Sequence, residues 1–166
     1  LHEVGHTIGL NHNFKSSYLH NNVDIHNKEL TEEVGLTGSV MDYTPVNLSL
    51  DTEKQGQYYS TVPGTYDDWA IEFGYSPPVK GLDQEKNRLD KILSRSSSPE
   101  LLFGNDADDM RSPGKGIDPR VMIGDMSNNP IEYSERRIAL INILMESLSG
   151  KYGIDGESYH RLRDAF

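Results

Sequence analysis

The 166-residue sequence contains no cysteine, so disulfide bonds and thiolate metal sites are both excluded. No stretch approaches the roughly 18 consecutive apolar residues that a membrane-spanning helix requires, and we therefore predict no membrane span in this chain. Hydrophobic residues make up only 35% of the sequence, and even with the 15 glycines the share stays below the roughly 45–50% of ordinary globular domains. This scarcity predicts a small core with long irregular connections.

Basic residues are also few. The 16 Lys and Arg stand against 26 Asp and Glu, which gives a formal net charge of −10. Proteins that bind nucleic acid contact phosphates through clustered Lys and Arg, and the densest basic cluster here is only His160, Arg161 and Arg163. Nucleic acid is thus excluded as a partner.

Apolar residues recur at helical spacing in several places. The sequence predicts helices at the start of the chain up to Gly9, over 66–73, from Asp83 to about Ser96, over 131–149 and over 158–166. In the helix over 131–149, we expect a continuous stripe to pack in the core, made of Ser134, Ile138, Ile141, Met145 and Leu148.

Long connections separate these helices. Residues 13–40 are polar and rich in turn formers, and residues 104–130 read as a long loop in which 121–123 is the one plausible short strand. We therefore predict a mainly α fold with long irregular loops. Residues 1–166 form a single domain or subdomain, with 1–75 carrying the site and 76–166 forming a helical C-terminal extension.

Residues 2–12 read HEVGHTIGLNH. His2 and His6 are four residues apart, so a helix projects both imidazoles from one face, and they can bind the same metal ion. Gly9 allows the backbone to leave the helix with positive φ, and the turn returns His12 as a third nitrogen ligand. Three protein nitrogens leave an open tetrahedral position for water, as in catalytic zinc sites. Glu3 lies near enough to bond that water without ligating the metal.

The extended histidine motif is followed by Ser-Val-Met-Asp-Tyr at 39–43. Taken alone, Met41 is an ordinary core side chain. Together, the two blocks resemble the metzincin superfamily of zinc endopeptidases, whose histidine motif precedes a tight turn with a Met beneath the metal. The resemblance implies one catalytic Zn²⁺ on His2, His6 and His12, with Glu3 as general base and Met41 in the Met-turn. It leaves Tyr43 as either a zinc ligand that swings away during catalysis or a packed Tyr bonded to backbone.

The resemblance extends to YDDWAIEFGY at 66–75 and is closest to a bacterial group of uncharacterised zinc-dependent metalloproteases common in Bacteroidetes. It suggests a secreted, periplasmic or cell-surface location and a peptide or protein substrate. Metzincins place a substrate-binding sheet before this helix, so the resemblance implies that residues 1–166 are the lower, C-terminal subdomain of an α+β catalytic domain. The partner would then be the missing N-terminal half.

His2 lies in the first helical turn, where backbone groups fray. We therefore expect the isolated segment to bind zinc weakly or not at all and to be inactive by itself.

Other polar residues permit weaker interpretations. Asp106, Asp108 and Asp109 either form a solvated loop or supply oxygens to Ca²⁺, although their spacing does not match an EF-hand loop. For His20 and His26 we expect surface or loop contacts, and for His160 solvent.

Three hypotheses follow. The first is a zinc-dependent endopeptidase in which Glu3 activates a zinc-bound water. The second is a catalytically silent, zinc-stabilised binding or scaffolding module. The third is a helical folding unit that docks onto another part of the protein. Glu3 beside an open metal position favours the first, because a binding module needs no general base there.

Overall fold

The computed structural model describes residues 1–109, 111, 116 and 118–166, in which helices alternate with long loops and no β-strand occurs. The α-helices are α1 (His2–Thr7), α2 (Lys28–Val34), α3 (Thr65–Tyr75), α4 (Leu82–Leu93), α5 (Pro130–Tyr152) and α6 (His160–Ala165). The short 3-10 helices are η1 (Ser16–Leu19), η2 (Asp24–His26), η3 (Thr52–Lys54) and η4 (Pro99–Leu101). The prediction of a mainly helical fold with long loops is confirmed, and this architecture is compatible with a C-terminal metzincin subdomain.

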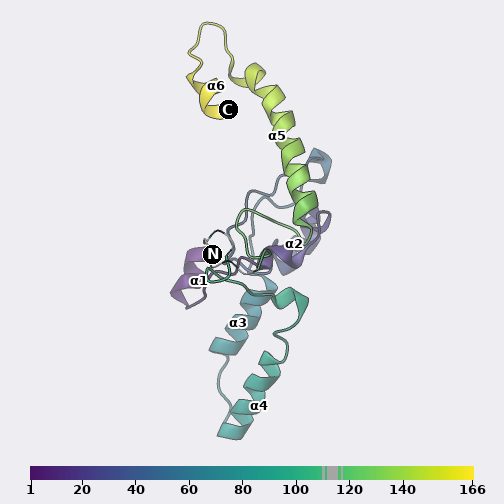
Figure 1. The fold of residues 1–166 in the computed structure, drawn as a ribbon. Helices are drawn as coiled ribbons and strands as arrows, with labels where there is room; N and C mark the ends of the chain where they lie inside the picture. The colour runs from purple at the N-terminus through teal and green to yellow at the C-terminus, as the bar shows by residue number, and fades with distance from the viewer. Residues whose placement is uncertain (110, 112–115, 117) are drawn as a thin grey trace.

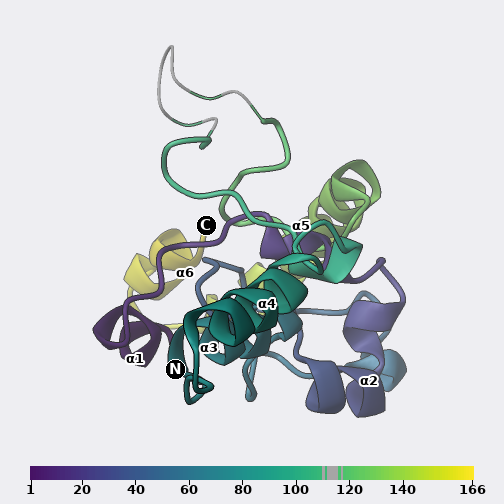
Figure 2. The same ribbon diagram turned by 90° about the horizontal axis from the view of Figure 1, so that it is seen from below.

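A loop-rich body carries α1 and α2, and two helical extensions leave it at opposite ends (Figure 1). One extension is the pair α3 and α4, which lie side by side (Figure 2), and the other is α5 followed by α6. None of the helices in the described residues is both long and apolar enough to cross a membrane.

The core of the body is small, as the composition predicts. One buried apolar cluster joins Ile25, Leu36, Met126 and Tyr133. Many of the other fully buried side chains are polar, including Asn13, Ser17, Thr31, Ser39, Asn47 and Ser127. Because burying a polar group is favourable only when it is hydrogen-bonded, the body depends on its hydrogen-bond network more than on apolar packing.

The segment 13–17 is the hub of this network, because its backbone bonds to three segments distant in sequence, at 38–41, 104 and 127. Its backbone hydrogen bonds are Asn13 N to Met41 O (3.0 Å), Phe14 N to Gly104 O (2.8 Å), Gly38 N to Ser16 O (2.9 Å) and Ser127 N to Ser17 O (2.9 Å).

Helix α3 fixes the turn that contains Met41. The buried carboxylate of Asp67, in the first turn of α3, accepts hydrogen bonds from Ser39 Oγ, from Val40 N at 2.8 Å and from Gly64 N at 2.9 Å. Ser39 Oγ in turn accepts a bond from Met41 N at 3.0 Å. One acidic side chain therefore holds both the start of its own helix and the turn at 39–41.

The two helices predicted over 66–73 and from Asp83 onward are present as α3 and α4, with small shifts at their ends. Trp69 donates from its indole Nε1 to Ile92 O at 2.9 Å, which joins the two helices. Ile92 is buried, whereas Leu93, the last residue of α4, is 40% exposed.

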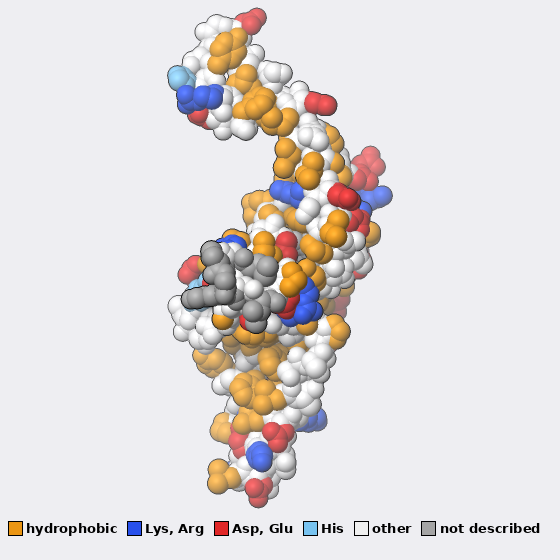
Figure 3. Space-filling view, viewed as in Figure 1, with side chains coloured by type: hydrophobic (Ala, Val, Ile, Leu, Met, Phe, Trp, Pro, Cys, Tyr) orange, Lys and Arg blue, Asp and Glu red, His pale blue; other side chains and the backbone are white. Residues whose placement is uncertain are grey.

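The expected core stripe on α5 is wrong. Only Tyr133 of this helix is buried, whereas Ile138 and Ile141 are 60% and 51% exposed. Helix α5 leaves the body after its first turns, and hydrophobic side chains lie open along this extension (Figure 3). The periodicity identifies the apolar face of a helix, but it does not show whether anything packs on that face. The helix also continues past Gly150 to Tyr152.

The strand predicted over 121–123 is wrong as well. Val121 is buried, but its N–H bonds to Asp118 O at 3.0 Å within a turn, and no neighbouring strand exists in the described part of the chain. A lone apolar triplet needs a pairing partner to become a strand, and this loop offers none.

The carboxyl of Asp42, in the turn at 39–43, lies near that of Asp125, and both are largely removed from solvent. Burial raises the pKa of Asp42 to about 7, and the nearby Asp125 adds to that rise. Burial likewise raises the pKa of Asp125 to about 6. Asp42 Oδ2 accepts hydrogen bonds from Ser16 Oγ and Ser17 N, both at 3.0 Å, whereas its Oδ1 is buried without a partner. Asp42 is therefore favoured in its neutral form at moderately acid pH.

We predict that Asp67→Ala lowers the free energy of unfolding by about 3–5 kcal/mol, because it leaves several buried donors without an acceptor. Chemical denaturation monitored by circular dichroism measures this change. Asp68→Ala is the matched control, since Asp68 is the next residue of the same helix turn and is exposed. Equal losses of unfolding free energy in Asp67→Ala and Asp68→Ala would contradict the role of Asp67 in holding the turn.

A second prediction concerns pH. Between about pH 4 and pH 7 the folded protein retains a proton on Asp42 that the unfolded chain has released, so this residue lowers stability progressively as pH rises through that window. Asp42→Asn keeps an acceptor for Ser16 and Ser17 but carries no charge. The stability of this variant relative to wild type is expected to increase by about 2–4 kcal/mol from pH 4 to pH 8 in urea denaturation. If the unfolding free energies of wild type and Asp42→Asn differ by the same amount at every pH, this prediction is refuted.

Candidate metal centre

Helix α1 presents His2 and His6 on one face, as their spacing of four residues predicts. The helix ends in a Schellman motif: Leu10 N donates to Gly5 O at 3.0 Å, and Gly9 N donates to His6 O at 3.1 Å. Gly9 has φ +88°, the left-handed conformation that this motif requires and that side chains disfavour. The predicted conformation of Gly9 is therefore present.

The reversal at Gly9 returns His12 to the face of α1. One ligand nitrogen from each of His2, His6 and His12 lies within 4.8 Å of the other two. Within the described residues this is the one cluster of His, Asp or Glu side chains arranged to hold a metal ion.

All three imidazoles are oriented through Nδ1. His2 Nδ1 bonds to Val40 O at 2.8 Å, His6 Nδ1 to Leu10 O at 3.0 Å, and His12 Nδ1 to Asp106 Oδ2 at 2.8 Å. Carbonyl oxygens only accept, so in His2 and His6 the Nδ1 atom carries the proton and Nε2 keeps its lone pair. His2 Nε2 is buried with no hydrogen-bond partner. Three imidazoles held through Nδ1, with Nε2 of His2 an orphaned buried acceptor, are a donor set that fits zinc.

The contact with Val40 bears on the expected fraying of the first turn. The hydrogen bond from His2 ties its side chain to a residue 38 positions away, in the turn that Asp67 fixes. The helix is also tied at its other end, because Tyr75 Oη donates to Ile8 O at 2.8 Å. These contacts oppose the fraying that the position of His2 in the sequence suggests.

Tyr43 lies against the same imidazoles. Its hydroxyl is 3.0 Å from His12 Nε2, and its ring stacks on the ring of His2 at a centroid distance of 4.7 Å. The Nδ1 of His12 faces a carboxylate and carries a proton, so in the neutral imidazole, the form that binds metal, Nε2 accepts and the Tyr43 hydroxyl donates. The side chain is 45% exposed. Of the two interpretations that the sequence left open, bonding to backbone is not observed among the described residues; the hydroxyl lies at the histidine cluster.

Met41 is completely buried beneath α1. A Cβ atom added to Gly5 would lie 2.2 Å from Met41 Sδ, so the helix approaches the thioether at the one position that has no side chain. The turn at 39–41 therefore supports α1 directly below the histidines.

Glu3 is exposed and lines a cavity of about 370 Å³ next to the cluster. The cavity walls include His2, Thr37, Tyr43, Thr44 and Tyr59. A carboxylate one residue from the His2 imidazole and open to this cavity can reach water or a bound substrate.

The remaining sequence expectations have different outcomes. The three acidic residues considered for Ca²⁺ face separate partners: Asp106 contacts His12, Asp108 contacts Asn105 N, and Asp109 pairs with Arg111. Nothing in this arrangement supports a calcium site. His20 makes the expected loop contact, from Nε2 to Gly35 O at 2.9 Å, although it is buried. Burial lowers the pKa of His26, and His160 is exposed.

Sequence reasoning missed the residues that support the ligands. Asp106 was considered only as a solvated residue or a calcium ligand, and no role was assigned to Asn13 or Asp67. No local pattern marks the contact of Asp106, because it lies 94 residues from His12. Asp67 did carry a signal, since an acidic residue in the first helical turn often bonds to backbone N–H groups.

A family model described as Met-zincin matches residues 1–166. No curated protein and no solved structure matches the chain.

We predict that Gly5→Ala lowers the free energy of unfolding by about 1–3 kcal/mol, because the new methyl group overlaps with Met41 in a filled site. Thermal or urea denaturation measures the loss. Gly74→Ala is the control: it also lies in a helix but has nothing within 4 Å, so it is expected to stabilise by about 0.5–1 kcal/mol.

The same substitution should cost less when Met41 is already Ala, because the overlapping thioether is then gone. If Gly5→Ala is equally destabilising in both backgrounds, the contact with Met41 is not the cause.

Proposed function

Because the chain belongs to the Met-zincin family, a family of zinc metalloprotease type, we propose that it acts as a zinc-dependent endopeptidase. His2, His6 and His12 would hold the metal, Glu3 would serve as general base, and Tyr43 would assist. The observation that carries this proposal is the orientation of the three imidazoles, each bonded through Nδ1 with its ligand nitrogen directed to one place.

Zinc bound there would polarise the scissile carbonyl and acidify water. The residues of the chain supply the proton transfers. Glu3 takes a proton from the attacking water on its carboxylate and returns it to the amine that leaves. The Tyr43 hydroxyl lies 3.0 Å from His12 Nε2; metal on that nitrogen would release the hydroxyl, which would then be free to donate its proton to the oxyanion that develops on the substrate.

The cavity beside Glu3 gives the substrate a place to bind. It is lined by Thr37, Thr44 and Ser60 together with the exposed ring of Tyr59. We propose that it receives a substrate side chain next to the cleaved bond, with hydroxyl groups and an aromatic face as its recognition elements.

The test is cleavage of a peptide library by the full-length protein that carries these residues, read by mass spectrometry. Glu3→Gln is expected to lower the cleavage rate by about 10²–10⁴-fold and to leave zinc content unchanged, since Gln keeps the size of the side chain but cannot act as a base. Glu33→Gln, an exposed position on α2, is the matched control and is expected to retain full activity.

Comparable cleavage by the Glu3→Gln variant would refute the role of Glu3. If neither protein cleaves but zinc is bound, that result favours the zinc-stabilised binding module over the peptidase. If neither cleaves and neither binds zinc, the metal assignment itself is wrong.

A further inference from the structure

We propose that Asp106 is a positioning residue of the metal centre, which orients His12 and increases the affinity of the site for zinc. This inference rests on the proposed zinc function and extends the site to the C-terminal half of the chain. The carboxylate Oδ2 of Asp106 lies 2.8 Å from His12 Nδ1.

His12 differs from the other two ligands in the kind of acceptor it uses. His2 and His6 bond to the backbone carbonyls of Val40 and Leu10, whereas His12 bonds to an ionisable side chain. A carboxylate that accepts from Nδ1–H fixes the tautomer and the ring orientation of a ligating His and makes its Nε2 more basic. Asp106 thus acts on the metal through His12 and does not touch it.

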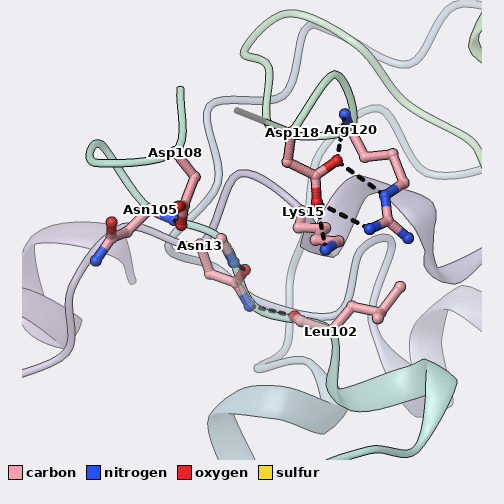
Figure 4. A network of polar contacts seen from close by, with 8 residues as sticks. Asn13, Lys15, Leu102, Asn105, Asp108, Asp118 and Arg120 are labelled. Atoms are coloured by element: carbon pink, nitrogen blue, oxygen red, sulfur yellow. Dashed lines mark hydrogen bonds and ion pairs between the residues drawn. The ribbon is translucent and has the colours of Figure 1, made fainter. Parts of the chain in front are cut away.

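The chain holds Asp106 in place through paired hydrogen bonds between two segments. The buried amide of Asn13 donates to Leu102 O at 3.0 Å and accepts from Gly104 N at 3.2 Å, while Phe14 N donates to Gly104 O at 2.8 Å. Figure 4 shows Asn13 facing the segment that contains Leu102. The two residues after His12, Asn13 and Phe14, therefore bond to the segment 102–104, which precedes Asp106.

Asp106 lies in a tight turn over residues 105–108. Asn105 Oδ1 accepts from Ala107 N, and Asn105 O accepts from Asp108 N, both at 2.9 Å. Further along, Lys15 and Arg120 both bind the Asp118 carboxylate (Figure 4), and the guanidinium of Arg120, together with Lys15, holds the pKa of that carboxyl well below its usual range. The loop is thereby attached to the body on both sides of the turn.

The ring of His12 is also held by stacking on a second side chain. It stacks on the fully buried ring of Phe14 at a centroid distance of 4.9 Å, with 27° between the planes. Asp106 then sets the remaining freedom, which is rotation of the imidazole within that plane. Its side chain is 62% exposed, so water weakens the contact, and we expect an effect near the lower end of the 10–100-fold range known for such groups.

The experiment measures the zinc dissociation constant of the wild-type chain and its variants by competition with a chromophoric chelator. Asp106→Asn is expected to weaken zinc binding about 10-fold, and Asp106→Ala more strongly, because Asn still accepts from Nδ1 and Ala does not. Co²⁺ in place of zinc gives a second reading: the visible absorption bands are expected to shift in both variants while the circular dichroism of the metal-free protein stays unchanged.

Asp108→Asn is the matched control, because Asp108 belongs to the same turn and its carboxylate contacts only Asn105 N in the described residues. It is expected to bind zinc as wild type does. Zinc affinities and Co²⁺ spectra that are equal in wild type and Asp106→Asn would overturn the inference while the proposed function stands. Equal losses in the Asp106 and Asp108 variants would also overturn it, since they would indicate damage to the turn. If the isolated wild-type chain binds neither metal, the same titrations are made on the full-length protein and its variants, and a full-length wild-type protein that binds neither metal would overturn both proposals.

Discussion

The hydrogen bonds of one buried side chain, Asn13, connect the parts on which the metal centre depends. Its amide reaches Leu102 and Gly104, and its own backbone N–H reaches Met41. Asn13 is fully buried, where an unpaired amide costs free energy. Separating segment 102–104 from Asn13 would leave its amide unpaired, and this cost holds the segments together. His12 directly precedes this residue, and its position follows from the same bonds. The histidine cluster is therefore a product of the network around Asn13 as much as of helix α1.

Polar groups carry much of the structural work in this chain. Two acidic residues of an acidic protein serve the interior, since Asp67 holds the turn at 39–41 and Asp42 accepts from Ser16 and Ser17, while the partly buried Asp118 joins Lys15 to Arg120. The net charge of −10 does not reveal which carboxylates are inside. A chain poor in apolar residues gains its unique arrangement from such directional contacts.

The sequence was most informative where structure is local. The spacing of His2 and His6, the turn at Gly9 and the return of His12 all lie within eleven residues, and helix geometry determines them. The contacts that orient these ligands are not local, since Val40 and Asp106 lie far along the chain and follow no repeating pattern. The same limit explains the stripe on α5, because an apolar face is local but its burial depends on what packs against it.

The three imidazoles differ in the length of chain that must close before each is oriented. His6 bonds to a carbonyl four residues away, so formation of α1 and its turn completes this contact. His2 requires closure of 38 residues and His12 of 94. Loop closure costs more entropy as the loop grows, about 0.6 kcal/mol for each doubling, and contacts of long separation form late in folding. We therefore expect the histidine cluster to assemble in order: His6 is oriented when α1 and its turn form, and His2 and His12 only when Val40 and Asp106 have docked.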